Sequence, residues 1–571
     1  MRTALPLPNP AFTTPAYRVP RHPASIDLRL DGNEGQGVPE SVLSALRELS
    51  GEGIRTYPTA ARLEARIAEK WKIQPEQVLV TAGADDGLLR MCRAFLGPGR
   101  KMVFPTPGFV MIPRFVEWTG GELCTVPWNT PEFPMEAVLE NSCPQTSILC
   151  VTSPNNPTGF VLNSEGLTHL SDQLPGCLLM VDEAYGEFAE EPLTPVALGL
   201  PNALVFRTFS KAYGLAGLRV GYVMGPEPLI ATLRRAGVPY PVSTPSLQVA
   251  EAVLDDTSTV ETRVRQSRTS RERLEGVLQG LGLQVETSHG NFVFARGLDG
   301  AWWRDGFAAL KMGIRAWPND PELGNAIRIS TTGCPMEAER VEHAARTLAE
   351  PEALLFDMDG VLVDVSRSYR TAILQTVASF GGTTDPEAIE KLKQQGNANN
   401  DWLVCQRILE GQGIRVELDG IREVFDGLVW GTETEPGLCT LERWVGSISK
   451  LRELTTRMPC ALVTGRPRQD AEQTLQRFGL DDLFSVRICM EDAPAKPSPE
   501  PIRKALTQLG VERAWMLGDT PDDAVAAREA GVLPLGVLAP GVPTETSTRT
   551  LLEAGAARVF ATWEDCMEIL P

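Results

Sequence analysis

The stretch EPEALLFDMDGVLVD, residues 350–364, decides how the chain is divided into domains. Its apolar run ALLF predicts a buried strand, and two carboxylates, Asp357 and Asp359, follow that run directly. A strand that carries paired acids at its C-terminal end is typical of the opening strand of a domain. Because this strand begins about 350 residues into the chain, we expect a complete domain before it and another after it.

Charge and cysteine content limit the class of protein. The net charge of −19 argues against a broad basic surface, so we expect no nucleic-acid partner and no binding to anionic lipid, although a local site for a small anion is compatible with it. The 11 cysteines include no CxxC pair, which indicates free thiols in a reducing compartment. We found neither a signal-peptide core nor a run of 18 apolar residues, so the expected location is cytoplasmic.

From about residue 40 to 245, short apolar runs alternate with amphipathic segments. Runs such as CLLMVDEAY (177–185) end in polar residues. This alternation predicts a parallel sheet with helices on both faces, and a ligand site beyond the carboxyl ends of the strands. Residues from about 246 onward mix long helical patterns with strand-like NFVFAR (291–296) and AIRIS (326–330), which indicates a smaller α+β domain.

Three motifs stand after strands of this first half, in the order SPNNPTG (153–159), VDEAY (181–185) and RTFSKAYGLAGLRVGY (207–222). Together they resemble the fold-type-I pyridoxal-phosphate aminotransferases, most closely the histidinol-phosphate aminotransferases. The resemblance extends over residues 1–349. It implies a large domain at about 40–245, and a small domain formed by the N-terminal arm and about 246–349.

The resemblance also implies roles for single residues around the cofactor ring. Lys211 would form the Schiff base with pyridoxal phosphate and then move a proton, which requires an unprotonated amine. Asp182 would pair with the pyridine nitrogen, so that the ring can accept electrons. Asn156 and Tyr185 would hydrogen-bond the ring hydroxyl oxygen. Phe109 would stack on the ring, or it packs in the core.

A cradle for the cofactor phosphate and a second subunit follow from the same resemblance. Backbone amides at the start of a helix suit a phosphate. Tyr57 matches a tyrosine that reaches this phosphate from the partner subunit, which implies a homodimer with shared active sites. The matching cradle residues are Ala84, Asp85, Thr208, Ser210 and Arg219.

The substrate contacts are less complete. Arg328 matches the arginine that binds the substrate anion, and Tyr17 and Asn33 match substrate-side positions. The histidinol-phosphate enzymes usually carry a second arginine where this chain has Trp317 in GIRAW. Arg315 lies two residues earlier, on the same face of a strand, so it is either a substitute or an ordinary surface arginine.

The second half carries four strand-end motifs in order, which are DMDGVLVD (357–364), CALVTGRP (460–467), AKPSPEPI (495–502) and AWMLGDTPDDAVAAREAG (514–531). They resemble the haloacid-dehalogenase superfamily of phosphatases. The resemblance implies a Rossmann-like core over residues 350–571. The helical pattern at about 366–445 predicts an inserted cap, which would exclude water and restrict access to small molecules.

In this superfamily the first aspartate attacks phosphorus and the second acts as acid and base. The match assigns these roles to Asp357 and Asp359. Close carboxylates and a phosphate repel one another, so a cation is needed, and Mg²⁺ prefers such oxygen ligands. The implied residues are Asp357, Asp359 (through its backbone carbonyl) and Asp519 for the metal, Thr464 and Lys496 for the phosphoryl group, and Asp523 in a supporting position.

The fusion suggests that one half makes the substrate of the other. Our hypothesis is transamination of imidazole-acetol phosphate, with glutamate as donor and 2-oxoglutarate as its product, followed by hydrolysis of histidinol phosphate in histidine biosynthesis. Two alternatives stay open. The pair could act on another phosphorylated amine or amino acid such as phosphoserine. The second half could instead sense a phosphometabolite and regulate the aminotransferase.

Overall fold

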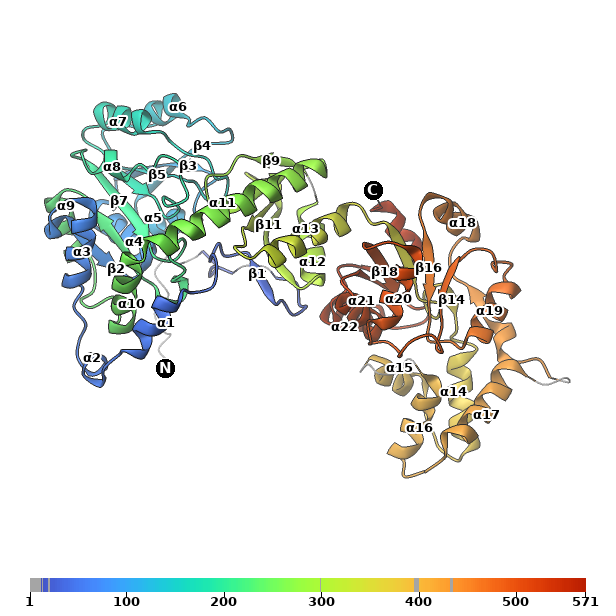
Figure 1. The fold of residues 1–571 in the computed structure, drawn as a ribbon. Coiled ribbons are helices and arrows are strands. Elements are labelled where there is room, and N and C mark those ends of the chain that lie inside the picture. Colours follow the sequence, from blue (N-terminus) through green and yellow to red (C-terminus); the bar gives the residue numbers. More distant parts are fainter. Residues whose placement is uncertain are drawn as a thin grey trace, which may run out of the picture. The chain divides into compact units, whose positions relative to one another are not determined.

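The computed structural model describes residues 12, 14–18, 21–297, 299–394, 400–431 and 435–570. The chain forms two compact units, which are coloured along the sequence in Figure 1. The first contains Leu30–Gly300 and Ile314–Glu339, and the second contains Ala301–Gly313 and the chain from Arg340 onward, with residues 21–29. The segments 21–29, 301–313 and 340–349, which we assigned to the first domain, therefore pack in the second unit. The domain boundary at residue 349 stays a prediction.

The first unit is built on a sheet of seven strands in the order β2-β8-β7-β6-β5-β3-β4. All neighbours are parallel except β8, which is antiparallel to β2 and β7. Successive strand residues enter opposite apolar layers, for example Val205 in one and Phe206 in the other. The strands are Val78–Thr81 (β2), Lys101–Thr106 (β3), Glu122–Pro127 (β4), Thr146–Thr152 (β5), Leu178–Asp182 (β6), Ala203–Thr208 (β7) and Gly221–Met224 (β8).

Helices cover the two faces of this sheet, as the strand–helix alternation predicts (Figure 1). The helix that follows β2, α4, begins at the carboxyl end of that strand, so its free N–H groups face the predicted ligand site. The helices are Glu40–Arg47 (α1), Gly51–Arg55 (α2), Ala61–Trp71 (α3), Gly83–Phe95 (α4), Met111–Thr119 (α5), Met135–Glu140 (α6), Ser164–Gln173 (α7), Thr194–Ala197 (α8), Glu227–Arg235 (α9) and Thr244–Asp255 (α10).

A second, five-stranded sheet has the order β1-β11-β12-β10-β9. Its central hairpin places Arg315 of β11 opposite Arg328 of β12. The elements are Leu28–Leu30 (β1), Gln284–Glu286 (β9), Phe292–Arg296 (β10), Met312–Asp320 (β11) and Gly324–Ser330 (β12), with helices Thr257–Gly280 (α11), Gly300–Ala309 (α12) and Pro335–Ala349 (α13).

The second unit contains a parallel six-stranded sheet in the order β17-β16-β13-β18-β19-β20. Strand β13, which directly precedes Asp357, pairs with β16 and β18, so the carboxyl ends of three neighbouring strands meet. This is the Rossmann-like core that the motifs predict. The strands are Ala353–Phe356 (β13), Cys460–Val463 (β16), Val486–Ile488 (β17), Ala514–Gly518 (β18), Leu533–Val537 (β19) and Val559–Phe560 (β20).

The insertion after β13 is helical in the parts that the structure describes, and α14 packs against α16 and α17 (Figure 1). The short strands β14 and β15 pair where the insertion leaves and rejoins the core. The insertion contains Val363–Asp364 (β14), Tyr369–Ser379 (α14), Pro386–Gln394 (α15), Asp401–Gly411 (α16), Leu418–Trp430 (α17) and Arg443–Trp444 (β15). The core helices are Ile448–Arg457 (α18), Arg468–Arg477 (α19), Glu500–Leu509 (α20), Pro521–Glu529 (α21) and Thr544–Ala554 (α22).

Contacts within the second unit join α12 and α13 to its sheet. The indole N–H of Trp515 donates to the carbonyl of Thr347 at 2.6 Å, and the Trp302 and Trp515 rings meet edge to face with centroids 5.4 Å apart. Arg528 of α21 donates to the carbonyl of Ala309 at 3.0 Å. Across the described part of the chain, every helix is too short or too polar to cross a membrane.

Candidate active sites

The predicted cofactor lysine and its neighbours come together beyond the strand ends of the first unit. The Lys211 Nζ atom donates to the carbonyl of Gly32 at 2.8 Å and lies 5.6 Å from the centre of the Tyr185 ring. The Tyr185 hydroxyl accepts a hydrogen bond of 3.0 Å from the side chain of Asn33. Asn33 is itself held by Ser330, since its backbone N–H donates to the Ser330 hydroxyl at 3.0 Å. The amine, the phenol and the amide are thus linked through buried contacts.

Asp182 ends β6 in a buried position and accepts a hydrogen bond of 3.1 Å from the Ala184 backbone N–H. Burial raises the pKa of the Asp182 carboxyl to about 7, and the nearby Lys211 ammonium opposes this effect. A buried carboxylate gains most from a cationic partner. A protonated ring nitrogen is such a partner.

The residues predicted to hold the cofactor phosphate also lie together. Arg219 donates to the Asp85 carboxylate at 2.9 Å, and the Thr208 hydroxyl donates to that of Ser210 at 2.9 Å. Gly83 opens α4 with φ of +78°, and a Cβ atom there would lie 2.8 Å from the Arg219 guanidinium. Glycine therefore lets the first turn of α4, which contains Ala84, approach this arginine closely.

Arg328, the predicted anion-binding residue, is buried and donates hydrogen bonds to Asn156 and Asp31. Its guanidinium donates to the side-chain oxygen of Asn156, and to the Asp31 carbonyl at 2.7 Å. Its Nε atom is buried and makes no hydrogen bond. Burial lowers the pKa of Arg328, and the charge of Arg315 adds to this effect. An anion bound here would accept a hydrogen bond from the Nε atom and would offset the positive charge of the two arginines.

Arg315 lies beside Arg328 and not on a remote surface. The two residues are Cα partners across β11 and β12, and one guanidinium nitrogen of Arg315 is buried without a hydrogen bond. The Trp317 ring lies next to both, with its centre 5.2 Å from the Arg315 Cζ atom and 5.9 Å from that of Arg328. The tryptophan therefore accompanies the arginine pair, and Arg315 is placed to act as the second arginine.

The positions of three predicted residues do not test the roles that the resemblance implies for them. Tyr17 is half exposed, at a distance where its phenol affects the electrostatics of Arg328. Tyr57 is 83 % exposed and stacks on Tyr240 with ring centroids 4.9 Å apart. Phe109 is partly buried against one apolar layer of the large sheet. Their roles toward the cofactor and the substrate stay predictions.

In the second unit, Asp357, Asp519 and Asp523 each direct a carboxylate oxygen into one group, within 4.8 Å of one another. Lys496 donates to Asp357 at 2.7 Å and is also ion-paired with Asp523. Burial raises the pKa of Asp357, while Lys496 opposes the rise. One ammonium does not balance three carboxylates, so the group attracts a further cation. Asp523 also accepts a bond of 2.6 Å from the Thr520 hydroxyl, which fits a supporting position.

Gly360 permits this arrangement because it has no side chain. It has φ of +77°, and a Cβ atom there would lie 2.1 Å from an Asp519 carboxylate oxygen. The DxDG sequence therefore lets the loop after β13 pass directly beside Asp519.

The Asp359 side chain does not join the carboxylate group, because it is held elsewhere. Arg466 donates to one Asp359 oxygen from Nε at 2.7 Å and from Nη2 at 2.6 Å. Arg466 is also bonded to Glu442 at 2.9 Å and to the Thr474 hydroxyl at 2.7 Å. The backbone N–H of Arg466 donates to Thr464 at 3.2 Å, which links the predicted phosphoryl contact to the same arginine.

Sequence reasoning missed Arg466 and Glu442. Both are buried, and Arg477 and Ser368 add further bonds to Glu442. Arg466 stood inside the quoted CALVTGRP motif, so its place two residues after Thr464 was the available signal. Glu442 follows the inserted helices and has no motif around it.

Comparison with known proteins agrees with this geometry. Residues 27–348 match the family model of aminotransferase class I and II. The chain belongs to the aminotransferase class I and II family. Residues 351–531 of this aminotransferase match a second model, haloacid dehalogenase-like hydrolase. Both resemblances of the sequence motifs, and the α/β fold class, are thereby confirmed.

Relatives of the aminotransferase chain include a protein of Phytophthora nicotianae named imidazoleglycerol-phosphate dehydratase. It is 44% identical over 221 residues, which cover 37% of this chain and 48% of that protein, so the chain spans about half its length. The histidinol-phosphate aminotransferase of Dinoroseobacter shibae is 34% identical over 275 residues, 47% of this chain and 76% of that protein. The crystal structure of histidinol-phosphate aminotransferase from Sinorhizobium meliloti in complex with pyridoxal-5'-phosphate has a TM-score of 0.55 and 26% identity, and covers 61% of this chain and 100% of that one.

The class I and II aminotransferase family implies pyridoxal phosphate, and the residues of this chain fit it. Asp182 is a buried carboxyl without enough compensating charge, and Lys211 lies near it. The Gly83 turn, the start of α4 and Arg219 form a cradle that a side chain at position 83 would fill. Haloacid dehalogenase-like hydrolases typically use Mg²⁺, and the all-oxygen group of Asp357, Asp519 and Asp523 suits that ion.

Proposed function

We propose that this chain is a bifunctional enzyme of histidine biosynthesis. Its first domain would transaminate imidazole-acetol phosphate with glutamate to histidinol phosphate, and its second would hydrolyse histidinol phosphate with Mg²⁺. The observation that carries the proposal is the pairing of half-buried Arg315 with buried Arg328, next to Asn156. Two guanidiniums side by side suit a dianion, and so favour a phosphorylated substrate for the first domain.

The names of the relatives support the same pathway. Several are histidinol-phosphate aminotransferases, such as that of Dinoroseobacter shibae. The Phytophthora relative is named for dehydration of imidazoleglycerol phosphate. Loss of water from a glycerol phosphate yields an acetol phosphate, which is the ketone that the proposed transamination consumes. A phosphatase domain on the same chain would remove the phosphate from the amine that results.

The roles of the residues in the first domain follow from their positions. Pyridoxal phosphate, when bound, supplies an electron sink for the substrate carbon. Lys211 would take up at Nζ the proton that this carbon loses. It would then give that proton back in the later step that completes the transfer of the amino group. Asp182 would keep the ring nitrogen protonated, and Asn156 and Tyr185 would orient the ring hydroxyl oxygen. Arg328 and Arg315 would bind the substrate phosphate.

In the second domain, an Asp357 oxygen would attack phosphorus as the bond from phosphorus to the substrate oxygen breaks. Asp359 would give its proton to that leaving oxygen, and then take a proton from the water that releases phosphate from Asp357. Lys496 and Thr464 would stabilise the phosphoryl oxygens. Asp357, Asp519 and the Asp359 carbonyl would hold Mg²⁺, which supplies positive charge against the transferring group.

We further propose a homodimer located in the cytoplasm. Exposed apolar side chains near Tyr57 support the dimer, since Ile54 is 66 % exposed, Val238 65 % and Tyr240 57 %. A subunit covering this surface would bury them and bring Tyr57 to a neighbouring site. The eleven cysteines are all free, which suits a reducing compartment.

The deciding experiment is release of inorganic phosphate from histidinol phosphate by the purified protein, with and without Mg²⁺, and with phosphoserine as the comparison substrate. Selective release that requires Mg²⁺ is the expected result. Preference for phosphoserine would mean that both domains act on another phosphorylated amino acid. Trp317, in place of the usual arginine, favours this alternative. Transamination would be followed in the same preparation from imidazole-acetol phosphate and glutamate.

A further inference from the structure

A cavity that is partly open to solvent lies between the core of the second unit and its inserted helices. Asp359 and Arg466 line it from the core. Tyr369, Trp402 and Phe425 line it from α14, α16 and α17, so much of the wall is aromatic.

The position of Asp359 in the wall indicates that the cavity holds the alcohol part of the substrate. In the proposed reaction Asp359 protonates the oxygen of the departing alcohol, so the alcohol must lie within reach of this carboxylate. The cavity is the space that Asp359 lines. Its other walls therefore contact the part of the substrate that distinguishes one phosphomonoester from another.

These walls are acidic. Asp401, Asp426 and Asp470 line the cavity together with Asp359, whereas Arg466 is the one guanidinium among its lining residues. Arg466 is bonded to Asp359 and Glu442. An anionic alcohol would have to lose its water among these carboxylates, which disfavours it strongly.

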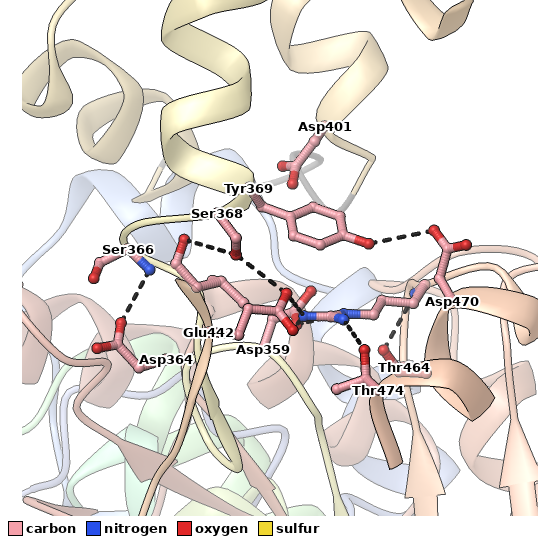
Figure 2. A network of polar contacts seen from close by, with 12 residues as sticks. Asp359, Asp364, Ser366, Ser368, Tyr369, Asp401, Glu442, Thr464, Asp470 and Thr474 are labelled. Atoms are coloured by element: carbon pink, nitrogen blue, oxygen red, sulfur yellow. Dashed lines mark hydrogen bonds and ion pairs between the residues drawn. The ribbon is translucent and has the colours of Figure 1, made fainter. Parts of the chain in front are cut away.

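The carboxylates differ in how far they are neutralised. Lys393 pairs with Asp401 at 3.0 Å, and Arg422 pairs with Asp426 at 3.4 Å. Asp470 instead accepts a hydrogen bond of 3.3 Å from the hydroxyl of Tyr369, which is a neutral donor (Figure 2). Burial raises the pKa of Asp470 to about 6, although the charge of Arg466 and the hydrogen bond from Tyr369 oppose this rise.

The aromatic walls complete the pattern. The Trp402 indole N–H donates to Asp426 at 3.1 Å, and Tyr369 is bonded to Asp470, so each of these carboxylates adjoins an aromatic ring. An arginine already uses the Trp402 ring, since the Arg422 Cζ atom lies 4.6 Å from its centre. Carboxylates beside aromatic faces bind ammonium and imidazolium groups through ion pairing and cation–π attraction.

We propose that this cavity selects phosphomonoesters in which the alcohol carries a protonated amine or imidazole, with Asp470 as the main contact and Asp426 as the second. The inference rests on the proposed phosphatase function and specifies its substrate class. It accounts for how one site could accept histidinol phosphate and reject phosphorylated hydroxy acids.

The test compares phosphate release from small two-carbon probes with Mg²⁺ present, namely phosphoethanolamine (ammonium), ethyl phosphate (uncharged alcohol) and phosphoglycolate (carboxylate), alongside histidinol phosphate. Wild-type kcat/KM is expected to be about ten- to hundredfold higher for phosphoethanolamine than for ethyl phosphate, and lowest for phosphoglycolate. Asp470→Asn should lower kcat/KM for phosphoethanolamine by a larger factor than kcat/KM for ethyl phosphate, so that most of the preference is lost, and Asp426→Asn should reduce the preference less. The matched control is Asp419→Asn, an exposed position of the same helix as Asp426.

Ethyl phosphate or phosphoglycolate turned over as well as phosphoethanolamine would overturn the inference and leave the phosphatase function standing. A preference that survives in both Asp470→Asn and Asp426→Asn would also overturn it. If either variant fails to fold, the wild-type comparison still decides. Release from none of the four probes would reject the phosphatase function itself, and the inference with it.

Discussion

Arg315 and Arg328 stand directly opposite each other on antiparallel strands, with the Trp317 ring beside both guanidiniums. Two like charges that lie close together in a half-buried place repel each other, and an anion bound beside them would offset that repulsion. We propose that Arg315 takes the part of the arginine that is missing at position 317, since it lies two residues earlier on the same face of the strand.

Replacing Arg315 tests this pair. Arg315→Gln should raise KM for imidazole-acetol phosphate about tenfold or more, because the dianion loses one of two cationic partners. Steady-state transamination rates measure this, and KM for glutamate should change much less. Arg265→Gln, on the exposed side of α11, is the control. An equal rise in KM for both substrates in Arg315→Gln would mean that Arg315 supports the fold and does not bind the substrate phosphate.

Replacing the proposed nucleophile separates the two activities. Asp357→Asn should abolish phosphate release, because an amide cannot form the bond to phosphorus, while transamination stays within about twofold of wild type. Both rates are measured in one preparation. The regulatory alternative makes the opposite forecast: wild type releases no phosphate, and the transamination rate responds to a phosphorylated metabolite.

A methyl group at Gly360 should disturb the metal site. The Cβ atom of Gly360→Ala would meet the Asp519 carboxylate, so the Mg²⁺ concentration for half-maximal phosphate release should rise about tenfold or more. Gly381→Ala is a matched control, because Gly381 has φ of +80° and open space around its Cβ position. It carries the same backbone strain without displacing a carboxylate. Similar Mg²⁺ curves for the two variants would assign the effect to strain alone.

The buried Asp182 should make the cofactor-free protein sensitive to pH. Its pKa is raised to about 7 in the folded state, so the folded protein binds more protons than the unfolded chain between pH 4 and 7. Stability is therefore lost as the pH rises through this range, by at most about 4 kcal/mol. Asp182→Asn removes the titration. The measurement is urea unfolding of cofactor-free protein at pH 5 and at pH 8. The free energy of unfolding of wild type should fall between these two pH values by more than that of the variant.

The reverse effect is expected once the cofactor is present. A protonated ring nitrogen compensates the Asp182 carboxylate, so cofactor binding should stabilise wild type more than Asp182→Asn. Dialysis against buffer, followed by the absorbance of retained cofactor, measures the difference. A variant that behaves like wild type in both experiments would show that Asp182 does not face the ring nitrogen.

Several features were predictable because their residues are close in sequence. The apolar run before Asp357, the TxSK segment around Lys211 and the acids after β18 each combine a buried strand with the polar residues that end it. Parallel strands then bring such ends to one edge of a sheet. This is why both folds, and the residues proposed for the two reactions, were predictable from the sequence.

Other features could not be read in this way. The pairing of Arg466 with Asp359 and Glu442 joins segments that are far apart in the chain, and an arginine in a loop is ordinarily exposed. The choice between Arg315 as a substrate contact and as a surface residue depended on strand register across a hairpin. The acidic cavity gathers carboxylates from different helices, none of which stands in a motif.

The sequence by itself thus determined the two families and the order of their domains, and it predicted the reactive residues, because these depend on local patterns of strand, turn and charge. The tertiary structure alone decided that Arg315 joins Arg328, that Arg466 holds Asp359, and that Asp470 faces a cavity with a neutral partner. The physical reason is that charge recognition depends on distance and burial in space. Neither quantity can be obtained from spacing along the chain.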